Sequence, residues 1–255
     1  MNIAHEKQKA REFLRGRYKE TALAVVVYIL VKGVCTALHG IYVYTCGDDA
    51  SEILNFFVKS LPNLIIPIFH FALVKAIIDM TRSSEPVSFK TYKANLNYGK
   101  LALGNYWWNT LWVLIWFLSI GASCLIISKI IKYIIDVVPG QAGAVFGIIL
   151  MLLIISFGIF LIIILISKPL SYCFDILILA ENPENGVIKS LKDSVKLTED
   201  DVYNLFLFNL SFIGWNILEF VTLGIACIWV RPYYILSKYN FYRSIAEKKL
   251  YYLHN

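Results

Sequence analysis

The sequence predicts an all-α fold: a polytopic transmembrane helix bundle with six spans, both termini in the cytoplasm, and interfacial amphipathic helices. Two observations predict this class. Hydrophobic residues make up 58% of the 255 residues and charged residues only 16%, whereas a soluble domain has about 45–50% and about 25%. The apolar residues also gather in runs of about twenty, the length of helix that crosses a hydrocarbon core about 30 Å thick. The chain is therefore expected to be solvated largely by lipid.

The spans are expected in five apolar regions, the last of which is divided in two. No signal peptide is expected before the first, because the opening residues are too polar to contain its apolar core. The expected spans are residues 21–44, 61–80, 101–127, 143–167, 203–221 and 224–240.

The last apolar region, residues 203–236, leaves five and six spans both open. As one helix it would be ~50 Å long, too long for one span and short for two. We expect a hairpin that turns at Gly224, because glycine adopts turn dihedrals at little steric cost. Prolines are expected to break or kink other helices: Pro67 in the second span, Pro169 at the end of the fourth, and Pro232 after the hairpin turn.

The placement of lysine and arginine predicts the orientation. With six spans, eighteen of the 24 basic residues flank spans on the face that holds the termini, and three flank spans on the opposite face. Positive charge marks the cytoplasmic side, so both termini are expected inside. With five spans the split weakens to fourteen against seven. Because these cations are spread along membrane flanks, nucleic acid is not expected as a partner.

Two polar segments are expected at the membrane surface. Residues 185–197 are expected to form a cytoplasmic amphipathic helix, with Ile188 and Leu191 on its apolar side. Residues 238–253 mix aromatic and basic residues, which is typical of an interfacial helix whose lysines meet anionic lipid. The 182–200 segment is in addition a candidate surface for a protein partner.

Several short motifs resemble those of an uncharacterised bacterial integral-membrane family. They are AREFLRGRY (10–18), FKTY (89–92), LAENP (179–183), the serine at 194, NLSFIGW (209–215), TLGI (222–225) and RPYY (231–234). On these motifs the chain resembles domain-of-unknown-function family 975, over most of its length. Two features depart from the family's pattern: residues 198–201 (Thr-Glu-Asp-Asp) replace a basic, glycine-containing turn, and Pro169 alone replaces a Pro-Gly break. The resemblance implies a fold and a bacterial plasma membrane, and no chemistry.

Charged groups inside apolar spans are costly, so each is a candidate functional residue. Lys32 lies about twelve residues into the first span, ~18 Å deep by helical rise. It is expected to face the bundle interior or a wet cavity. There it is either an anchor satisfied by carbonyls, His39 or His70, or part of an ion, proton or lipid-headgroup site.

Three further polar residues belong to this candidate intramembrane site. Glu219 and Arg231 flank the expected hairpin turn at depths that match within ~3 Å, so an ion pair that closes the hairpin is expected. Asn209 lies in the stretch with the strongest family resemblance, where a buried asparagine either bridges helices or binds a substrate.

The sequence contains no catalytic or metal-binding pattern. A G-x-S-x-G elbow, an H-E-x-x-H pair and a P-loop are all missing, and the five cysteines are scattered. We expect no catalytic residue, no metal and no cofactor, and reduced cysteines.

The expected function is that of a non-enzymatic membrane protein that acts by binding, as an accessory or protective factor of the cell envelope or of a transporter. The alternative is a small carrier or lipid-handling protein that uses Lys32 and the proline-broken helices. The oligomeric state is not predicted.

Overall fold

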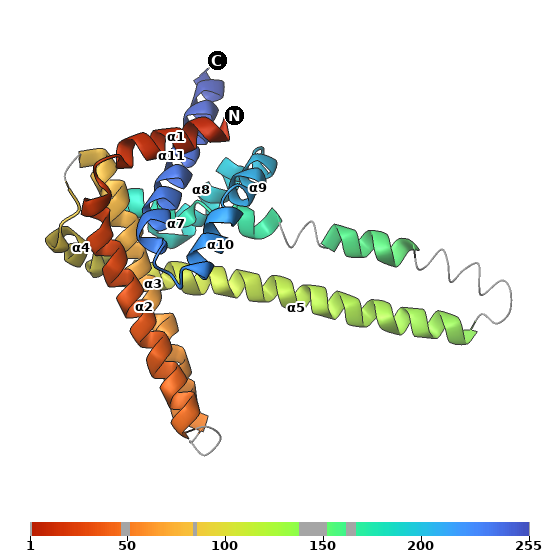
Figure 1. Cartoon of the computed structure of the whole chain (residues 1–255). Helices are drawn as coiled ribbons and strands as arrows, with labels where there is room; N and C mark the ends of the chain where they lie inside the picture. The colour runs from red at the N-terminus through yellow and green to blue at the C-terminus, as the bar shows by residue number, and fades with distance from the viewer. Residues whose placement is uncertain (1, 47–51, 84–85, 138–151, 162–166, 255) are drawn as a thin grey trace. The chain divides into compact units, whose positions relative to one another are not determined.

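The computed structural model describes residues 2–46, 52–83, 86–137, 152–161 and 167–254, which form helices joined by short turns, with no strand among them. They divide into two compact units, residues 1–106 with 173–255 and residues 107–172. Helix α5 (Gly99–Val137) begins in the first unit and continues in the second (Figure 1). The other helices of the first unit are α1 (Ile3–Leu14), α2 (Tyr18–Cys46), α3 (Glu52–Ser83), α4 (Phe89–Asn95), α7 (Asp175–Glu181), α8 (Gly186–Thr198), α9 (Val202–Leu210), α10 (Ile213–Val221) and α11 (Cys227–His254).

Four helical segments of the described residues are long and apolar enough to cross a membrane. They are Tyr18–Cys46, Asn55–Ser83, Phe89–Ile130 and Val202–Val221. These segments correspond to the first, second, third and fifth expected spans, and they indicate a membrane protein. The fourth expected span, residues 143–167, lies mostly outside the described residues, of which 152–161 are helical. The sixth is not among the four segments, because Arg231 and Lys238 interrupt its apolar character.

Helix α3 is the central helix of the first unit. Residues 71–78 are buried on all sides, and α2, α4, α7 and α11 pack against α3. The helix continues through Pro67, so the break expected there is absent. A proline removes only one backbone hydrogen bond, and an apolar surrounding gives the neighbouring backbone groups no other partners.

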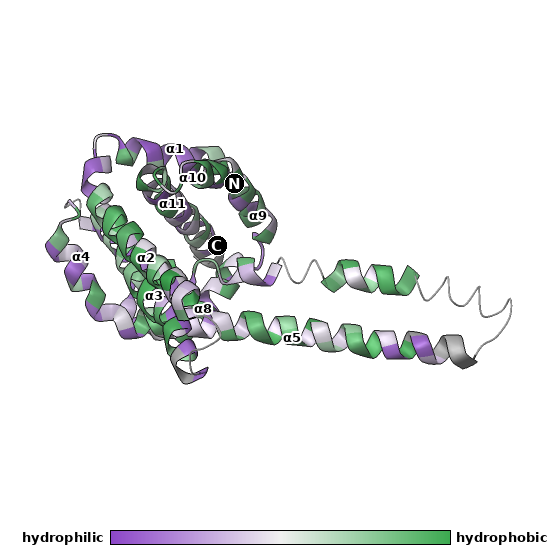
Figure 2. Cartoon of the chain, turned by 60° about the horizontal axis from the view of Figure 1, so that its bottom comes forward, coloured by the Kyte–Doolittle hydropathy of each residue, from purple (hydrophilic) through white to green (hydrophobic). Residues whose placement is uncertain are grey.

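The outer surface of α2 is strongly apolar. Leu30, Val34, Leu38 and Ile41 are each between 56% and 61% exposed, and in Figure 2 α2, α3 and α5 are predominantly hydrophobic. Contiguous apolar surface of this extent needs a cover. Lipid is the cover that the composition of the chain predicts.

Helix α11 corrects the expectations for the C-terminal region. It continues through Pro232, so the expected sixth span and the expected interfacial tail at 238–253 are parts of one helix. Tyr239, Phe241 and Tyr242 are buried instead of lying at a membrane surface. The reason is tertiary packing, because α11 lies against α1, α2, α3 and α8.

The segment 202–221 is divided at its middle. A turn at Ser211–Phe212 separates α9 from α10. A second turn leads from α10 to α11, and in it Leu223 and Gly224 have positive φ angles of 51° and 90°. Glycine adopts this conformation easily, whereas leucine is strained in it.

Pro169 lies inside the helical residues 167–171, and the chain turns only after them, at residues 172–174. The break is therefore placed a few residues beyond the proline. A proline is tolerated where it does not remove a needed hydrogen bond, so its own position is not where the helix has to end.

Helix α8 occupies the place of the expected amphipathic helix and buries Leu191 as expected, but Ile188 is not on its buried side. Ser190, Leu191, Ser194 and Thr198 are buried, whereas Ile188 is 54% exposed. The buried hydroxyls bond to backbone groups of their own helix or to the Phe174 N–H. Because these hydrogen bonds are local, small polar side chains can form the buried side of the helix.

Candidate functional site

A polar pocket of about 350 Å³ lies between α9, α10 and α11. Its lining residues are Asn209, Phe212, Asn216, Glu219, Val230, Arg231 and Tyr234. Three residues of the polar site expected from the sequence, Asn209, Glu219 and Arg231, therefore line one pocket. The turn between α10 and α11 brings them together, because it returns α11 alongside α10.

The central feature of the pocket is an ion pair. Arg231 Nη2 donates a hydrogen bond to Glu219 Oε2 at 2.7 Å. The Glu219 side chain is 9% exposed and that of Arg231 36%. The pair joins α10 to α11 across the turn, as the matching depths of the two residues predict. Breaking a buried pair by removing one partner leaves an uncompensated charge, so the pair stabilises the hairpin.

The second carboxylate oxygen of Glu219 is not used by the pair. Glu219 Oε1 is buried and has no hydrogen-bond partner among the described residues, although the Cys227 thiol lies beside both charged groups. A buried acceptor that lacks a partner costs about 1–3 kcal/mol. The pocket therefore holds an acceptor that a bound donor would satisfy.

Asn209 joins α9 to α11. Its Oδ1 accepts a hydrogen bond from the Tyr234 hydroxyl at 3.1 Å, and its Nδ2 donates to the Leu205 carbonyl at 3.0 Å. Both ends of the amide are thus engaged, which is the bridging role expected of a buried asparagine. Asn216 contributes a more exposed amide to the same lining.

Aromatic rings form a rigid wall of the pocket. The Phe212 ring is buried, and its centroid lies 5.2 Å from that of Phe208, 5.3 Å from Tyr233 and 5.0 Å from Tyr234. Such pairs add about 0.5–1.5 kcal/mol each beyond the burial of their area. The charged side of the pocket therefore faces a wall with little freedom to move.

Two basic residues of helix α1 contact these aromatic residues and the turn at Ser211–Phe212. Lys7 Nζ donates to the Ser211 carbonyl at 3.2 Å and to its hydroxyl at 3.1 Å, and lies 4.2 Å from the centroid of the Phe212 ring. Arg11 Nε donates to the Tyr233 hydroxyl at 3.1 Å. The interrupted helix leaves carbonyls without intrahelical partners, and a cation at the C-terminal end of α9 satisfies one of them.

Lys32 and His70 do not line this pocket, although the charges of Arg231 and Lys32 both act on the His70 ring. Lys32 is exposed on α2, which contradicts the expectation that it faces the bundle interior or a cavity. The described helices therefore leave the Lys32 side chain uncovered. His70 packs instead against the Tyr28 ring, with the ring centroids 5.6 Å apart.

The sequence reasoning missed a second polar cluster, centred on Glu181 at the end of α7. Glu181 is 9% exposed. Its Oε1 accepts hydrogen bonds from the Tyr239 hydroxyl at 3.0 Å and from Arg243 Nη1 at 3.1 Å, and its Oε2 accepts from the Tyr242 hydroxyl at 2.9 Å. Burial, and then the Glu181 charge, raise the pKa of Tyr242, so its hydroxyl remains a donor.

Two cations of α3 complete this Glu181 cluster. Arg82 Nη1 donates to the Glu181 carbonyl at 2.8 Å, and Lys75 Nζ donates to the Ala180 carbonyl at 3.1 Å and to Asp79 Oδ1 at 3.2 Å. They bind the free carbonyls at the C-terminal end of α7, which is where a helix attracts cations. The cluster fastens α3, α7 and α11 together. The glutamate of the LAENP motif and the helical spacing of residues 239, 242 and 243 were its signals in the sequence.

The five cysteines are free, and the described residues contain no group of His, Cys, Asp or Glu side chains that could hold a metal ion.

Comparison with protein families gives one match. A family model described as "Protein of unknown function (DUF975)" matches residues 1–249, which confirms the resemblance that the sequence motifs predict. Comparisons with curated proteins and with solved structures gave no match.

Proposed function

We propose a role for this chain, which belongs to the DUF975 family of proteins of unknown function, from its own site residues. It is an integral membrane protein that catalyses no reaction and acts by binding, as an accessory or protective factor of the cell envelope or of a transporter. The polar pocket between α9, α10 and α11 is its binding site.

The observation that carries this proposal is Glu219 Oε1, which has no hydrogen-bond partner among the described residues and lies on the carboxylate that pairs with the Arg231 guanidinium. The carboxylate oxygen accepts a hydrogen bond from a cationic group, and the guanidinium can bind an anionic group. The two charges are adjacent, so the pocket matches a small zwitterion in which a cation and an anion are separated by a short linker. Phosphoethanolamine, free or as a lipid headgroup, has this arrangement.

The alternative role as a carrier has less support. It depends on Lys32 and on helices broken by proline at mid-membrane depth. Lys32 is exposed on α2, and α3 continues through Pro67.

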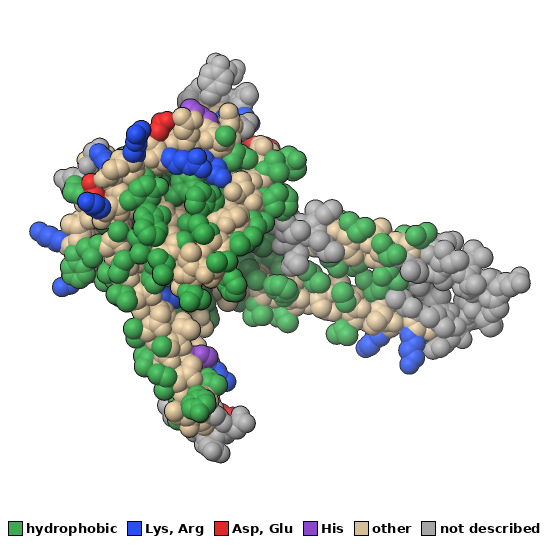
Figure 3. Space-filling view, in the orientation of Figure 1, with side chains coloured by type: hydrophobic (Ala, Val, Ile, Leu, Met, Phe, Trp, Pro, Cys, Tyr) green, Lys and Arg blue, Asp and Glu red, His purple; other side chains and the backbone are tan. Residues whose placement is uncertain are grey.

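The proposal includes six spans, both termini in the cytoplasm and a bacterial plasma membrane. The packing of α1 against α11 supports termini on one side, since Asn240 Nδ2 donates to the Glu6 carbonyl at 3.3 Å. Basic side chains also gather around α1 and α4 on the face shown in Figure 3. Anionic lipid on the cytoplasmic side would be attracted to such a surface.

A protein partner at residues 182–200 remains part of the proposal. The outer side of α8 supports it, because Ile188 is exposed there beside the exposed Lys189 and Lys192 of the same helix. An exposed branched apolar side chain with basic neighbours suits a partner segment with an apolar residue and acidic flanks.

The binding proposal is tested by thermal unfolding of the full chain in an uncharged glycoside detergent. Glycerophosphoethanolamine should raise the unfolding midpoint, by ~2–4 °C for each kcal/mol of binding free energy. Glycerol 3-phosphate and ethanolamine, which carry one charge each, should have smaller effects. The ligand should be recovered unchanged after incubation, as measured by mass spectrometry.

The matched variants are Glu219→Gln and Arg231→Gln, with Glu184→Gln as the control. Glu184 is an exposed glutamate away from the pocket. The first two should lose the shift and the control should keep it. An equal shift in all three, or no shift in the unaltered chain, would refute the assignment of the pocket, and conversion of the ligand would refute the non-enzymatic role.

A further inference from the structure

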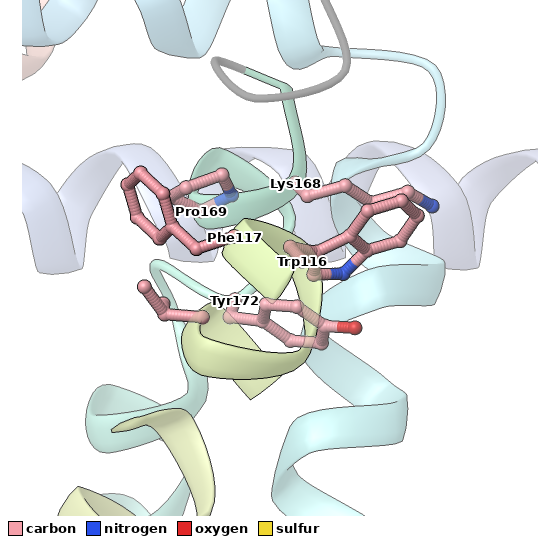
Figure 4. Close-up of a pocket in the computed structure, with 6 residues that line it drawn as sticks. Trp116, Phe117, Lys168, Pro169 and Tyr172 are labelled. Carbon is pink, nitrogen blue, oxygen red and sulfur yellow. The ribbon is translucent and has the colours of Figure 1, made fainter. Parts of the chain in front are cut away.

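The second unit contains a separate pocket with a different character. It has a volume of about 110 Å³ and is lined by Val113, Trp116, Phe117, Lys168, Pro169 and Tyr172. The lining is almost wholly apolar except at the tips of three side chains. In Figure 4 the Lys168 ammonium, the indole nitrogen of Trp116 and the Tyr172 hydroxyl all point to the same side.

The three polar tips offer donors and a positive charge. Lys168 Nζ lies 5.5 Å from the centroid of the Trp116 ring, and no carboxylate pairs with it among the described residues. Trp116 Nε1 is buried and has no hydrogen-bond partner in the described part of the chain. An indole N–H is a donor only, and an ammonium has three donors and no acceptor. The group that would satisfy this cluster is therefore an anion with several acceptor oxygens.

Lys168 directly follows the apolar run 143–167, so it lies at the end of an apolar segment. Trp116 lies in the middle of the uncharged run 101–128 and lines the pocket together with Lys168. Tryptophan, tyrosine and extended lysine side chains concentrate where hydrocarbon meets headgroups.

We propose that Trp116, Lys168 and Tyr172 bind the phosphate of an anionic phospholipid, whose acyl chain lies on Val113, Phe117 and Pro169. The apolar lining suits a hydrocarbon chain, and the donor cluster suits its phosphate. No acidic side chain lines the pocket, so the ammonium of a zwitterionic headgroup would have no carboxylate to pair with. The stacked Trp112 and Tyr172 rings, with centroids 6.3 Å apart, hold the tyrosine in place. This site does not depend on the Glu219–Arg231 pocket.

The test is competitive lipid binding to the full chain, measured by native mass spectrometry. The chain is purified in an uncharged detergent and mixed with equal amounts of phosphatidylglycerol and phosphatidylcholine of identical acyl chains. Phosphatidylglycerol adducts should dominate. Lys168→Gln should reduce them by about tenfold, which is the effect of losing one charge-assisted hydrogen bond.

Two further variants separate a lipid site from a structural role. Trp116→Phe retains the ring but removes the donor, so it should lower phosphatidylglycerol binding by a smaller factor. Lys168→Arg should retain it. Lys129→Gln, an exposed lysine of the same unit, is the control and should change nothing.

Three outcomes would overturn the proposal. The unaltered chain could bind both lipids equally. Lys168→Gln could behave like Lys129→Gln. Glycerol phosphate without acyl chains could displace the lipid completely at matched concentration, which would identify a site for free phosphate instead. Circular dichroism spectra of all variants check that a loss of binding is not a loss of fold.

Discussion

At the scale of single residues, Glu219 and Arg231 show how one pair can serve both fold and site. One carboxylate oxygen of Glu219 closes the α10–α11 turn, and the other is buried and has no hydrogen-bond partner in the described part of the chain. A carboxylate in this position is tolerated because the guanidinium compensates its charge. The Arg231 side chain is partly exposed, so water screens its charge. This screening lowers the free energy that the ion pair contributes.

Substituting both partners measures this coupling. Glu219→Gln and Arg231→Gln should each lower the free energy of unfolding by about 1–3 kcal/mol. The double variant should lose less than the sum, by about 1–2 kcal/mol, because the second change removes a group that already lacks its partner. Denaturant unfolding in detergent measures all three variants. Purely additive losses would show that the two residues do not interact.

Much of this site could be predicted from the sequence, and part of it could not. Charges within an apolar region and a glycine between them predict that Glu219 and Arg231 meet. Lys32 satisfies the same rule of a charge within an apolar run, yet it lies exposed on α2. Hydropathy gives the depth of a residue and not the side of the helix on which neighbours pack. The Glu181 cluster was not predicted for a related reason. Tyr239 and Arg243 lie about sixty residues from Glu181 in the chain, and the cluster draws its residues from three helices.

At the scale of elements, the interruption of segment 202–221 is the informative feature. Neither α9 nor α10 is long enough to cross a bilayer alone, at nine residues each and about 13 Å of rise. Their junction at Ser211–Phe212 is held by Lys7 of α1. A polar helix thus supports the middle of an apolar segment, which suits a place where the chain leaves hydrocarbon for a more polar surrounding.

Removing this support should loosen the junction. Lys7→Met keeps the length of the side chain and removes the ammonium, so we expect a loss of about 0.5–1.5 kcal/mol. Backbone amides of residues 211–213 should exchange hydrogen faster, as measured by exchange mass spectrometry. Lys19→Met changes an exposed lysine in the first turn of α2, so it is the control and should leave those amides unchanged. Equal protection in both variants would mean that Lys7 does not stabilise the junction.

At the scale of the whole molecule, the two ends of the chain belong to one unit. Helix α1 lies against α11, and α11 in turn contacts the central helix α3. If both termini lie on the same side of the membrane, the chain crosses the membrane an even number of times. The proposed arrangement places the α2–α3 connection on the opposite side, because α2 is a single crossing.

This arrangement predicts the accessibility of Cys46, which lies at the end of α2. In a chain whose other four cysteines are replaced by alanine, an impermeant maleimide should label Cys46 in intact cells. A cysteine introduced on α8, by Lys189→Cys together with Cys46→Ser, should be labelled only after permeabilisation. Labelling of both positions under the same condition would place them on one side and exclude the proposed crossings.

The all-helical class and four apolar segments could be predicted because runs of apolar residues are a local property. Whether residues 238–253 lie at a membrane surface or pack inside the fold could not be predicted from the sequence. Aromatic and basic side chains mixed on one helix are typical of a membrane surface, and they equally form a packed face when acceptors such as Glu181 come from elsewhere in the chain. Only the tertiary partner distinguishes the two. The same holds for α8, whose buried side combines Leu191 with three hydroxyl side chains and does not include Ile188.

The bond from Lys7 to Ser211 also has a consequence in time. The two residues are 204 positions apart in the chain, so at ~5–20 residues per second the ribosome adds Ser211 only ~10–40 s after Lys7. Tyr233 and Asn240, the other partners of α1, are translated later still. During nearly all of synthesis α1 is complete while its docking surface does not yet exist. Helix α1, which precedes the other described helices in the chain, is therefore among the last to be fastened.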